Sequence, residues 1–167
     1  MTPDELAWSQ AYTARNEGGD IAIPYQDSRG IWTIGIGCSG TDPYCSPDPI
    51  IGPDTVWTPE QRAEQFQIRH DRALEQAAAD VGDAWDEIDG TRQAALLDIA
   101  YQDGGGNPKT GVGGLEGYHL MLAAARIQDW PTASAQCLDS ANDRETPARC
   151  QRNAAILLTG QRPDLTF

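Results

Sequence analysis

The sequence predicts a helix-rich α+β fold. Segments in which apolar residues recur at helical spacing cover most of the 167 residues, and strand-like patterns occur convincingly only within residues 21–37. Hydrophobic residues make up 40% of the chain and charged residues 22%, so a packed core at single-domain size is expected. We predict one domain over residues 1–167. It has a small lobe at about 15–57 and a helical lobe at about 58–167 that includes the N-terminal helix, with a cleft between the lobes.

The first predicted elements are a helix and a β-hairpin. Residues 2–5 supply a hydroxyl N-cap, a proline at the first helical position and two acids in the first turn, so a helix is expected from here to Glu17. Residues 21–25 form an extended run and residues 26–30 a turn. Residues 31–37 then alternate apolar with small side chains, which is typical of a returning strand.

An irregular stretch separates the hairpin from the remaining helices. Residues 38–57 hold four prolines and two cysteines, so a long loop is expected there. Thr58 and Gln61 form a capping box that opens a long helix to about Asp80. Further helices are predicted at residues 91–103, 115–128, 131–140 and 146–159, the last ending at Gly160.

Charge and hydropathy exclude several classes of partner. The chain has 25 acidic and 12 basic residues, a net charge of −13, so neither nucleic acid nor an anionic membrane surface is an expected partner. No run approaches the roughly 18 apolar residues of a membrane span, so membrane insertion is not expected. Residues 1–5 are acidic where a signal peptide is basic, so no cleavable leader is expected.

Four cysteines allow three pairings: Cys38, Cys45, Cys137 and Cys150. No pair has C-x-x-C spacing and the histidines lie far from them in sequence, so a zinc site is not expected, and no cofactor is implied. Closeness in sequence predicts the disulfides Cys38–Cys45 and Cys137–Cys150, which would require an oxidising compartment. Four reduced thiols in a cytosolic chain are the alternative.

Two carboxylates have surroundings that suit acid–base chemistry. Glu17 ends the first predicted helix, Asp27 lies in the hairpin turn, and Thr33 follows on the returning strand. A carboxyl at a helix C-terminus and a carboxylate in a polar turn experience different environments, as a general acid and a general base require. Their spacing alone favours a capping glutamate and a turn aspartate without a catalytic role.

A longer motif surrounds these residues. Glu17-Gly18 is followed by Tyr25-Gln26-Asp27-x-x-Gly30-x-x-Thr33-Ile34-Gly35-Ile36-Gly37. Later segments follow in order: residues 92–97 with Gln102, residues 110–115, Trp130, and residues 146–152 with the pattern Thr-Pro-x-Arg-x-x-Arg. This succession resembles the lysozymes of the T4 phage type over almost the whole chain, and the hairpin motif is its most specific part.

The resemblance implies a lysozyme-like fold and a muramidase activity. Such enzymes hydrolyse the β-1,4 bond between N-acetylmuramic acid and N-acetylglucosamine in bacterial peptidoglycan, with inversion. By this likeness Glu17 is the general acid, Asp27 the carboxylate that activates water, and Thr33 the hydroxyl that orients the water. Inverting glycosidases hold their two carboxyls roughly 6.5–9.5 Å apart, which leaves room for that water.

Four further residues are candidate substrate-binding residues. Arg149, in the Thr-Pro-x-Arg pattern, is expected beside Glu17, and Gln102 is a candidate sugar ligand. Trp32 and Tyr25 could offer apolar faces to sugar rings, although hairpin aromatics more often belong to a core.

The sequence departs from the family pattern in two places. Nine residues separate the two carboxylates, one more than in the T4 phage enzyme, and we expect Gly19 or Pro24 to take up the extra residue. Cys38 stands where many relatives have a histidine. The predicted bridge to Cys45 would replace the anchoring role of that histidine.

Two other functions share the same scaffold. A lytic transglycosylase uses a single acid and leaves anhydro ends, and the presence of Asp27 and Thr33 argues against it. A non-catalytic glycan-binding or structural phage module is the other alternative. The resemblance implies a monomeric endolysin made in the host cytoplasm. It would be released with the help of a holin and act on the cell wall in the periplasm or outside the cell. A virion-borne lysozyme or a secreted effector would have a similar sequence.

Overall fold

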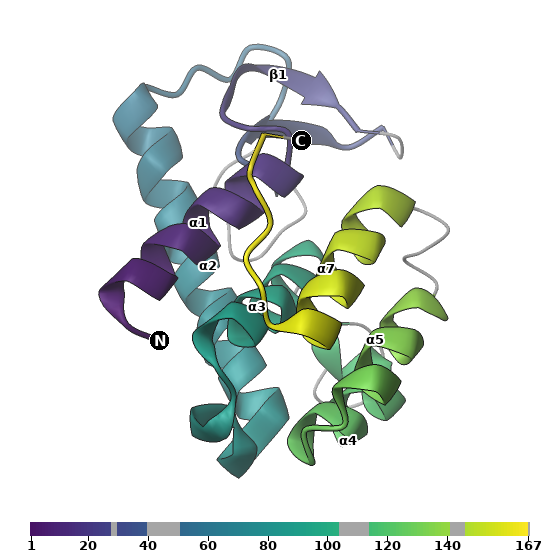
Figure 1. Cartoon of the computed structure of the whole chain (residues 1–167). Helices are drawn as coiled ribbons and strands as arrows, with labels where there is room; N and C mark the ends of the chain where they lie inside the picture. Colours follow the sequence, from purple (N-terminus) through teal and green to yellow (C-terminus); the bar gives the residue numbers. More distant parts are fainter. Residues whose placement is uncertain (28–29, 40–50, 104–113, 141–145, 167) are drawn as a thin grey trace. The chain divides into compact units, whose positions relative to one another are not determined.

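The computed structural model describes residues 1–27, 30–39, 51–103, 114–140 and 146–166. The described residues combine helices with a small antiparallel sheet, which confirms the α+β class (Figure 1). The chain divides into two compact units. The sheet-containing unit is Thr13–Arg72, and the helical unit consists of Met1–Tyr12 and Ala73–Phe167.

The N-terminal helix α1 spans Pro3–Asn16, as predicted. Its first turn is a capping box: the Glu5 carboxylate accepts hydrogen bonds from the Thr2 backbone N–H at 2.6 Å and hydroxyl at 3.0 Å. In return, the Thr2 hydroxyl oxygen accepts from the Glu5 backbone N–H at 3.3 Å. The helix ends before Gly18, so Glu17 follows its last residue directly.

The sheet has three antiparallel strands among the described residues, in the order β1-β2-β3. They are β1 (Ile21–Gln26), β2 (Trp32–Gly35) and β3 (Cys38–Ser39). The predicted hairpin is therefore confirmed, whereas β3 begins where a loop was expected. A strand of two residues is too short to show an alternating pattern, and only its pairing with β2 identifies it.

The long helix α2 spans Pro59–Val81. The predicted capping box at its start is present, since the Thr58 backbone N–H donates to Gln61 Oε1 at 2.9 Å and the Gln61 N–H donates to the Thr58 hydroxyl at 3.2 Å. The sheet contributes side chains to a small hydrophobic core. It contains Ile34, Cys38 and Ile51, with Trp32 and Trp57 partly buried against it.

The helical unit is built around α3 (Gly90–Asp103), most of which is buried. The other elements are the 3-10 helices η1 (Gly82–Glu87) and η2 (Leu115–Tyr118) and the helices α4 (His119–Arg126), α5 (Trp130–Leu138) and α7 (Pro147–Thr159). Helix α5 packs against α4 and α7, and α3 packs against α7. Four helices were predicted in these places, but η1 was not, and the helix expected from 115 begins as a 3-10 turn.

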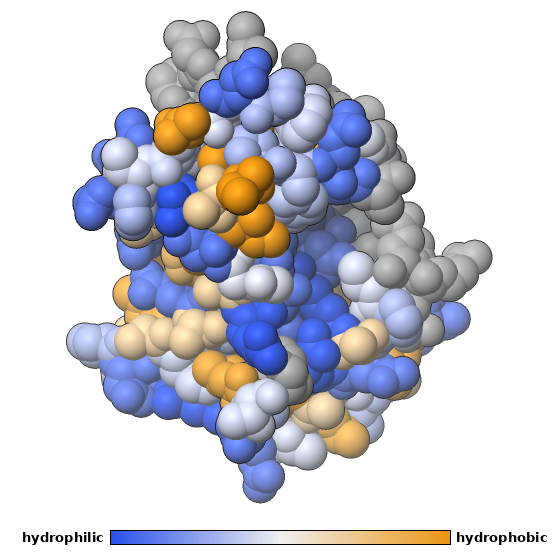
Figure 2. Space-filling model, turned by 90° about the horizontal axis from the view of Figure 1, so that it is seen from above, coloured by the Kyte–Doolittle hydropathy of each residue, from blue (hydrophilic) through white to orange (hydrophobic). Residues whose placement is uncertain are grey.

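The face drawn in Figure 2 is mainly polar where its residues are described. Figure 2 shows hydrophilic residues over much of one face, with hydrophobic residues in small groups. Among the described residues, the large apolar side chains that are most exposed are Ile23, Val56 and Ile127. Within the described residues, no helix combines the length and the apolar composition needed to cross a membrane.

Candidate active site

Asp27 is fixed by the hairpin turn that follows β1. Its backbone N–H donates to the Ile31 carbonyl at 2.9 Å, and its carbonyl accepts from the Gly30 N–H at 2.9 Å. Its carboxylate oxygen Oδ1 accepts from the Ile31 backbone N–H at 2.8 Å. The turn therefore determines the orientation of the Asp27 carboxylate through its own backbone.

The pairing of β1 with β2 is irregular just before this turn. Ile21 pairs with Gly35 and Tyr25 with Thr33, so four residue steps on β1 face two on β2. Strands take up extra residues in bulges of this kind. The irregular stretch includes Pro24, which has no N–H to donate and was one of the two positions expected to take up the extra residue.

Thr33 lies in the central strand β2 and is 5% exposed. Its hydroxyl donates to the Ile31 carbonyl at 3.2 Å. Thr33 pairs with Ser39 on one side and with Tyr25 on the other. Because residues directly opposite each other on paired strands point to the same face of a sheet, Thr33 and Tyr25 share a face.

The charges of both carboxylates affect the pKa of Tyr25. Burial raises the pKa of its half-buried hydroxyl, and the negative charges of Glu17 and then Asp27 raise this pKa further. The charges of both carboxylates thus act on the Tyr25 hydroxyl, and Asp27 lies two residues along the chain from Tyr25. Glu17, Asp27, Tyr25 and Thr33, four of the residues that the sequence singled out, all belong to the sheet-containing unit.

The Glu17 side chain lies over Gly37. The Glu17 backbone N–H donates to the Thr13 carbonyl at 3.0 Å, which continues the hydrogen bonding of α1. A Cβ atom added to Gly37 would lie 2.9 Å from Glu17 Cδ and closer still to Glu17 Oε2. Gly37 also has a φ of +67°, which L side chains rarely adopt. This glycine therefore gives the Glu17 carboxyl the space that it occupies.

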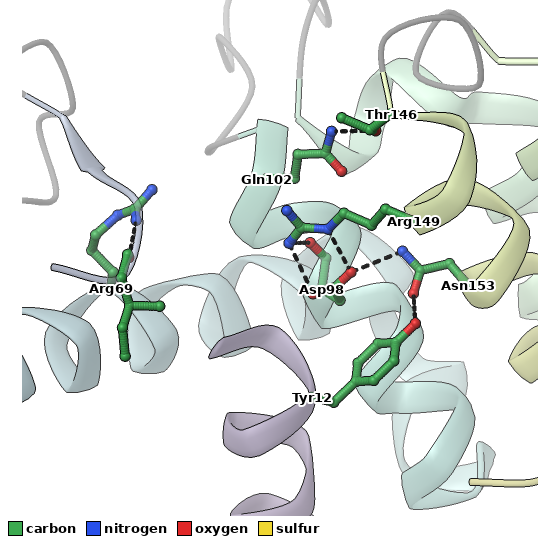
Figure 3. A network of polar contacts seen from close by, with 8 residues as sticks. Tyr12, Arg69, Asp98, Gln102, Thr146, Arg149 and Asn153 are labelled. Atoms are coloured by element: carbon green, nitrogen blue, oxygen red, sulfur yellow. Dashed lines mark hydrogen bonds and ion pairs between the residues drawn. The ribbon is translucent and has the colours of Figure 1, made fainter. Parts of the chain in front are cut away.

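Arg69 is a residue of this site that sequence reasoning missed. It lies on α2 and is 9% exposed. Its Nη1 donates to the carbonyl of Gly37 at 2.7 Å and to that of Ile36 at 3.2 Å. Figure 3 shows the Arg69 side chain. Its helical position was predictable, but nothing local in the sequence indicates a bond to a strand end more than 30 residues earlier.

Two of the predicted substrate-binding residues have clear local roles. Trp32 is half-buried and packs against the core of Ile34, Cys38 and Ile51, which favours the core alternative for this aromatic residue. Gln102 lies at the end of α3, where its Nε2 donates to the Thr146 hydroxyl at 2.9 Å. Its role as a sugar ligand stays a prediction.

Arg149 takes part in a buried polar network in the helical unit (Figure 3). Its Nε and Nη2 donate to the two carboxylate oxygens of Asp98 at 2.9 and 2.8 Å. Asn153 donates to Asp98 Oδ2 and accepts from the Tyr12 hydroxyl. Asp98 was not predicted to have a role. The expected closeness of Arg149 to Glu17 stays a prediction, because these residues belong to different units.

The cysteines follow the predicted pairing only in part. Cys38 is in a disulfide, and its predicted partner Cys45 lies outside the described residues. The predicted bond between Cys137 and Cys150 is wrong. Their sulfur atoms are 3.7 Å apart, whereas a disulfide bond is about 2.05 Å long. Packing of α5 against α7 brings the two thiols together, and each makes a contact with the other residue's carbonyl instead.

Comparisons with known proteins relate part of the chain to a phage protein. No family model matches the chain. The chain is 35% identical over 80 residues, 48% of its length, to the pre-baseplate central spike protein Gp5 of enterobacteria phage T4. It spans 13% of the length of that protein. Part of the chain is thus similar to a segment of a phage protein.

Proposed function

We propose that this protein is a peptidoglycan hydrolase that cleaves the β-1,4 bond between N-acetylmuramic acid and N-acetylglucosamine. The observation that carries the proposal is that the charges of two carboxylates from different elements, Glu17 and Asp27, both act on the Tyr25 side chain. The similarity to a phage protein agrees with a role in phage attack on the bacterial cell wall.

The proposed reaction uses the two carboxyl groups on opposite sides of the glycosidic bond. Glu17 donates its proton to the bridging oxygen as the bond from C1 to that oxygen breaks, and the bonding electron pair stays on the oxygen. Water attacks C1 from the other face and gives its proton to Asp27. One water is consumed, the configuration at C1 inverts, and a separation of roughly 6.5–9.5 Å between the carboxyls leaves room for that water.

The local contacts support these roles. The hydrogen bond from the Ile31 N–H holds Asp27 Oδ1, so the carboxylate that takes up the proton has a defined direction. Thr33 shares a sheet face with Tyr25, and the negative charges of both carboxylates raise the pKa of the Tyr25 hydroxyl. We therefore assign to the Thr33 hydroxyl the role of orienting the attacking water. Preorganised groups of this kind need little rearrangement during the reaction.

The decisive experiment compares Glu17→Gln and Asp27→Asn with Glu64→Gln, an exposed carboxylate of α2, as the matched control. Each protein is incubated with purified peptidoglycan, and new reducing ends are counted. Loss of general acid or base catalysis lowers rates by about 10²–10⁴-fold, which is the expected effect of the first two substitutions, with folding retained by circular dichroism. Full activity of E17Q would remove Glu17 from the acid role.

Mass spectrometry of the digest distinguishes a hydrolase from a lytic transglycosylase. Hydrolysis leaves muramyl reducing ends that carry one water more than the anhydro ends of a transglycosylase. Anhydro products would overturn the hydrolase proposal in favour of the transglycosylase. Binding of peptidoglycan by the wild-type protein without any new ends would favour the non-catalytic module.

A further inference from the structure

Two buried arginines lie seven residues apart on α2, about two helical turns, and both belong to the sheet-containing unit. Arg62 is 8% exposed and Arg69 is 9% exposed. Arg62 donates to the Asp20 carboxylate at 2.6 Å and to the Trp57 carbonyl at 2.7 Å. Arg69 instead donates to the carbonyls at the Ile36–Gly37 turn. The two arginines are thus similarly buried, but Arg62 binds a carboxylate and a carbonyl whereas Arg69 binds the carbonyls of Ile36 and Gly37.

Of these two arginines, Arg69 has its guanidinium beside the Glu17 carboxyl. A Cβ atom on Gly37 would lie 3.3 Å from Arg69 Nη1 and 2.9 Å from Glu17 Cδ, so the guanidinium and the carboxyl flank the same glycine. Arg62 approaches the corresponding position on Gly35 with its aliphatic carbons, at 3.5–3.7 Å. Its guanidinium is bound elsewhere, to Asp20.

We propose that Arg69 is a positioning residue for Glu17. Its guanidinium fixes the Ile36–Gly37 backbone under the Glu17 carboxyl, and its charge stabilises the carboxylate that forms when Glu17 has given up its proton. This inference rests on the proposed function, in which Glu17 is the general acid.

The physical argument concerns charge that develops during the reaction. As the proton moves from Glu17 to the bridging oxygen, the carboxyl becomes negative, and a fixed cation beside it stabilises that negative charge more strongly than water would. Arginine suits this task because one guanidinium stays charged and donates to several acceptors in a fixed geometry. A lysine keeps the charge but offers one compact ammonium group in place of the planar fork.

The test measures kcat and KM on soluble, uncrosslinked glycan strands for R69Q, R69K, R62Q and E17Q, at a temperature where each variant is folded. We expect R69Q to lower kcat about tenfold or more, with KM changed less than about twofold, because an interaction made mainly in the transition state is lost. R69K should lie between R69Q and the wild type, with kcat lowered about threefold. R62Q, the matched control, should lower the unfolding temperature but change kcat less than about twofold.

Each outcome separates this inference from the proposed function. If E17Q is inactive while R69Q and R69K keep the wild-type kcat, Arg69 only anchors the turn and this inference is wrong. If R69Q and R62Q lower kcat equally, the lower kcat results from the loss of a buried arginine in general, and the inference is again wrong. Should R69Q not fold, R69K decides the question, since an unchanged kcat would overturn the inference. An active E17Q would instead overturn the proposed function and this inference with it.

Discussion

The carboxyl of Glu17 occupies the space above Gly37 that a side chain would otherwise fill. We therefore predict that Gly37→Ala displaces this carboxyl and lowers activity at least about tenfold, because an acid group shifted by about 1 Å loses its reactive geometry. Since Gly37 also has positive φ, the substitution should cost roughly 1–2 kcal/mol of unfolding free energy. Denaturant unfolding and reducing-end release measure the two effects.

Gly82→Ala is the control for G37A. Gly82 has a φ of +74°, but a Cβ atom added there would meet nothing within 4 Å. G82A should therefore have a similar backbone cost with wild-type activity. Equal activity of G37A and G82A would show that the Glu17 carboxyl does not depend on the space above Gly37.

Asp27 combines a structural and a chemical role that two substitutions can separate. Asn in its place keeps an oxygen that can accept the hydrogen bond from the Ile31 N–H, whereas Ala removes it. We predict that D27N and D27A both lose activity about 100-fold or more. D27A alone should lose roughly 1 kcal/mol of stability. Thermal unfolding and peptidoglycan digestion check this, and an active D27N would remove Asp27 from the base role.

Local signals explain why much of the fold was predictable. The capping boxes of Thr2 with Glu5 and of Thr58 with Gln61 each involve residues three positions apart, and both helices begin where expected. Asp27 could likewise be placed from its turn, because its carboxylate and its backbone are hydrogen-bonded to Gly30 and Ile31, which lie three and four residues later. Features that depend on residues close together in the sequence could therefore be predicted from the sequence pattern.

Contacts between distant segments explain what was missed. Arg69 bonds to the Gly37 carbonyl 32 residues earlier, and Asp98 binds Arg149, 51 residues later. Neither arginine shows a local pattern that names its partner. The pair Cys137 and Cys150 shows the opposite error, since closeness in sequence correctly predicted closeness in space but not the covalent bond.

The buried pair of Asp98 and Arg149 should dominate the stability of the helical unit. Asp98 is fully buried and Arg149 nearly so, and removal of one partner of a buried ion pair leaves an uncompensated charge. We predict that R149M lowers the free energy of unfolding by about 3–5 kcal/mol. Equilibrium denaturation of the whole chain measures this loss.

The exposed pair of Arg162 and Asp4 is the matched comparison for this buried pair. The side chain of Asp4 is 85% exposed, so D4N should cost less than about 1 kcal/mol. Equal losses for R149M and D4N would contradict the assignment of stability to burial of the Asp98 pair.

The alkaline titration of Tyr25 tests directly whether the two carboxylates converge. Burial and the charges of Glu17 and Asp27 raise the pKa of Tyr25 in the folded state. This folded pKa lies above the unfolded value of about 10. The contribution of Tyr25 to the free energy of unfolding is therefore fully present below pH 10 and is lost as pH rises through the folded pKa. Subtracting the ultraviolet titration of Y25F from that of the wild type isolates Tyr25.

In this titration E17Q and D27N should each move the Tyr25 transition to lower pH, since each removes one of the negative charges that oppose ionisation. Burial remains, so the transition should stay above its ordinary position. E64Q, which removes an exposed charge on α2, should leave it in place. A Tyr25 transition that moves in neither E17Q nor D27N would mean that the carboxylates do not meet at this side chain, and the proposed active site would lose its main support.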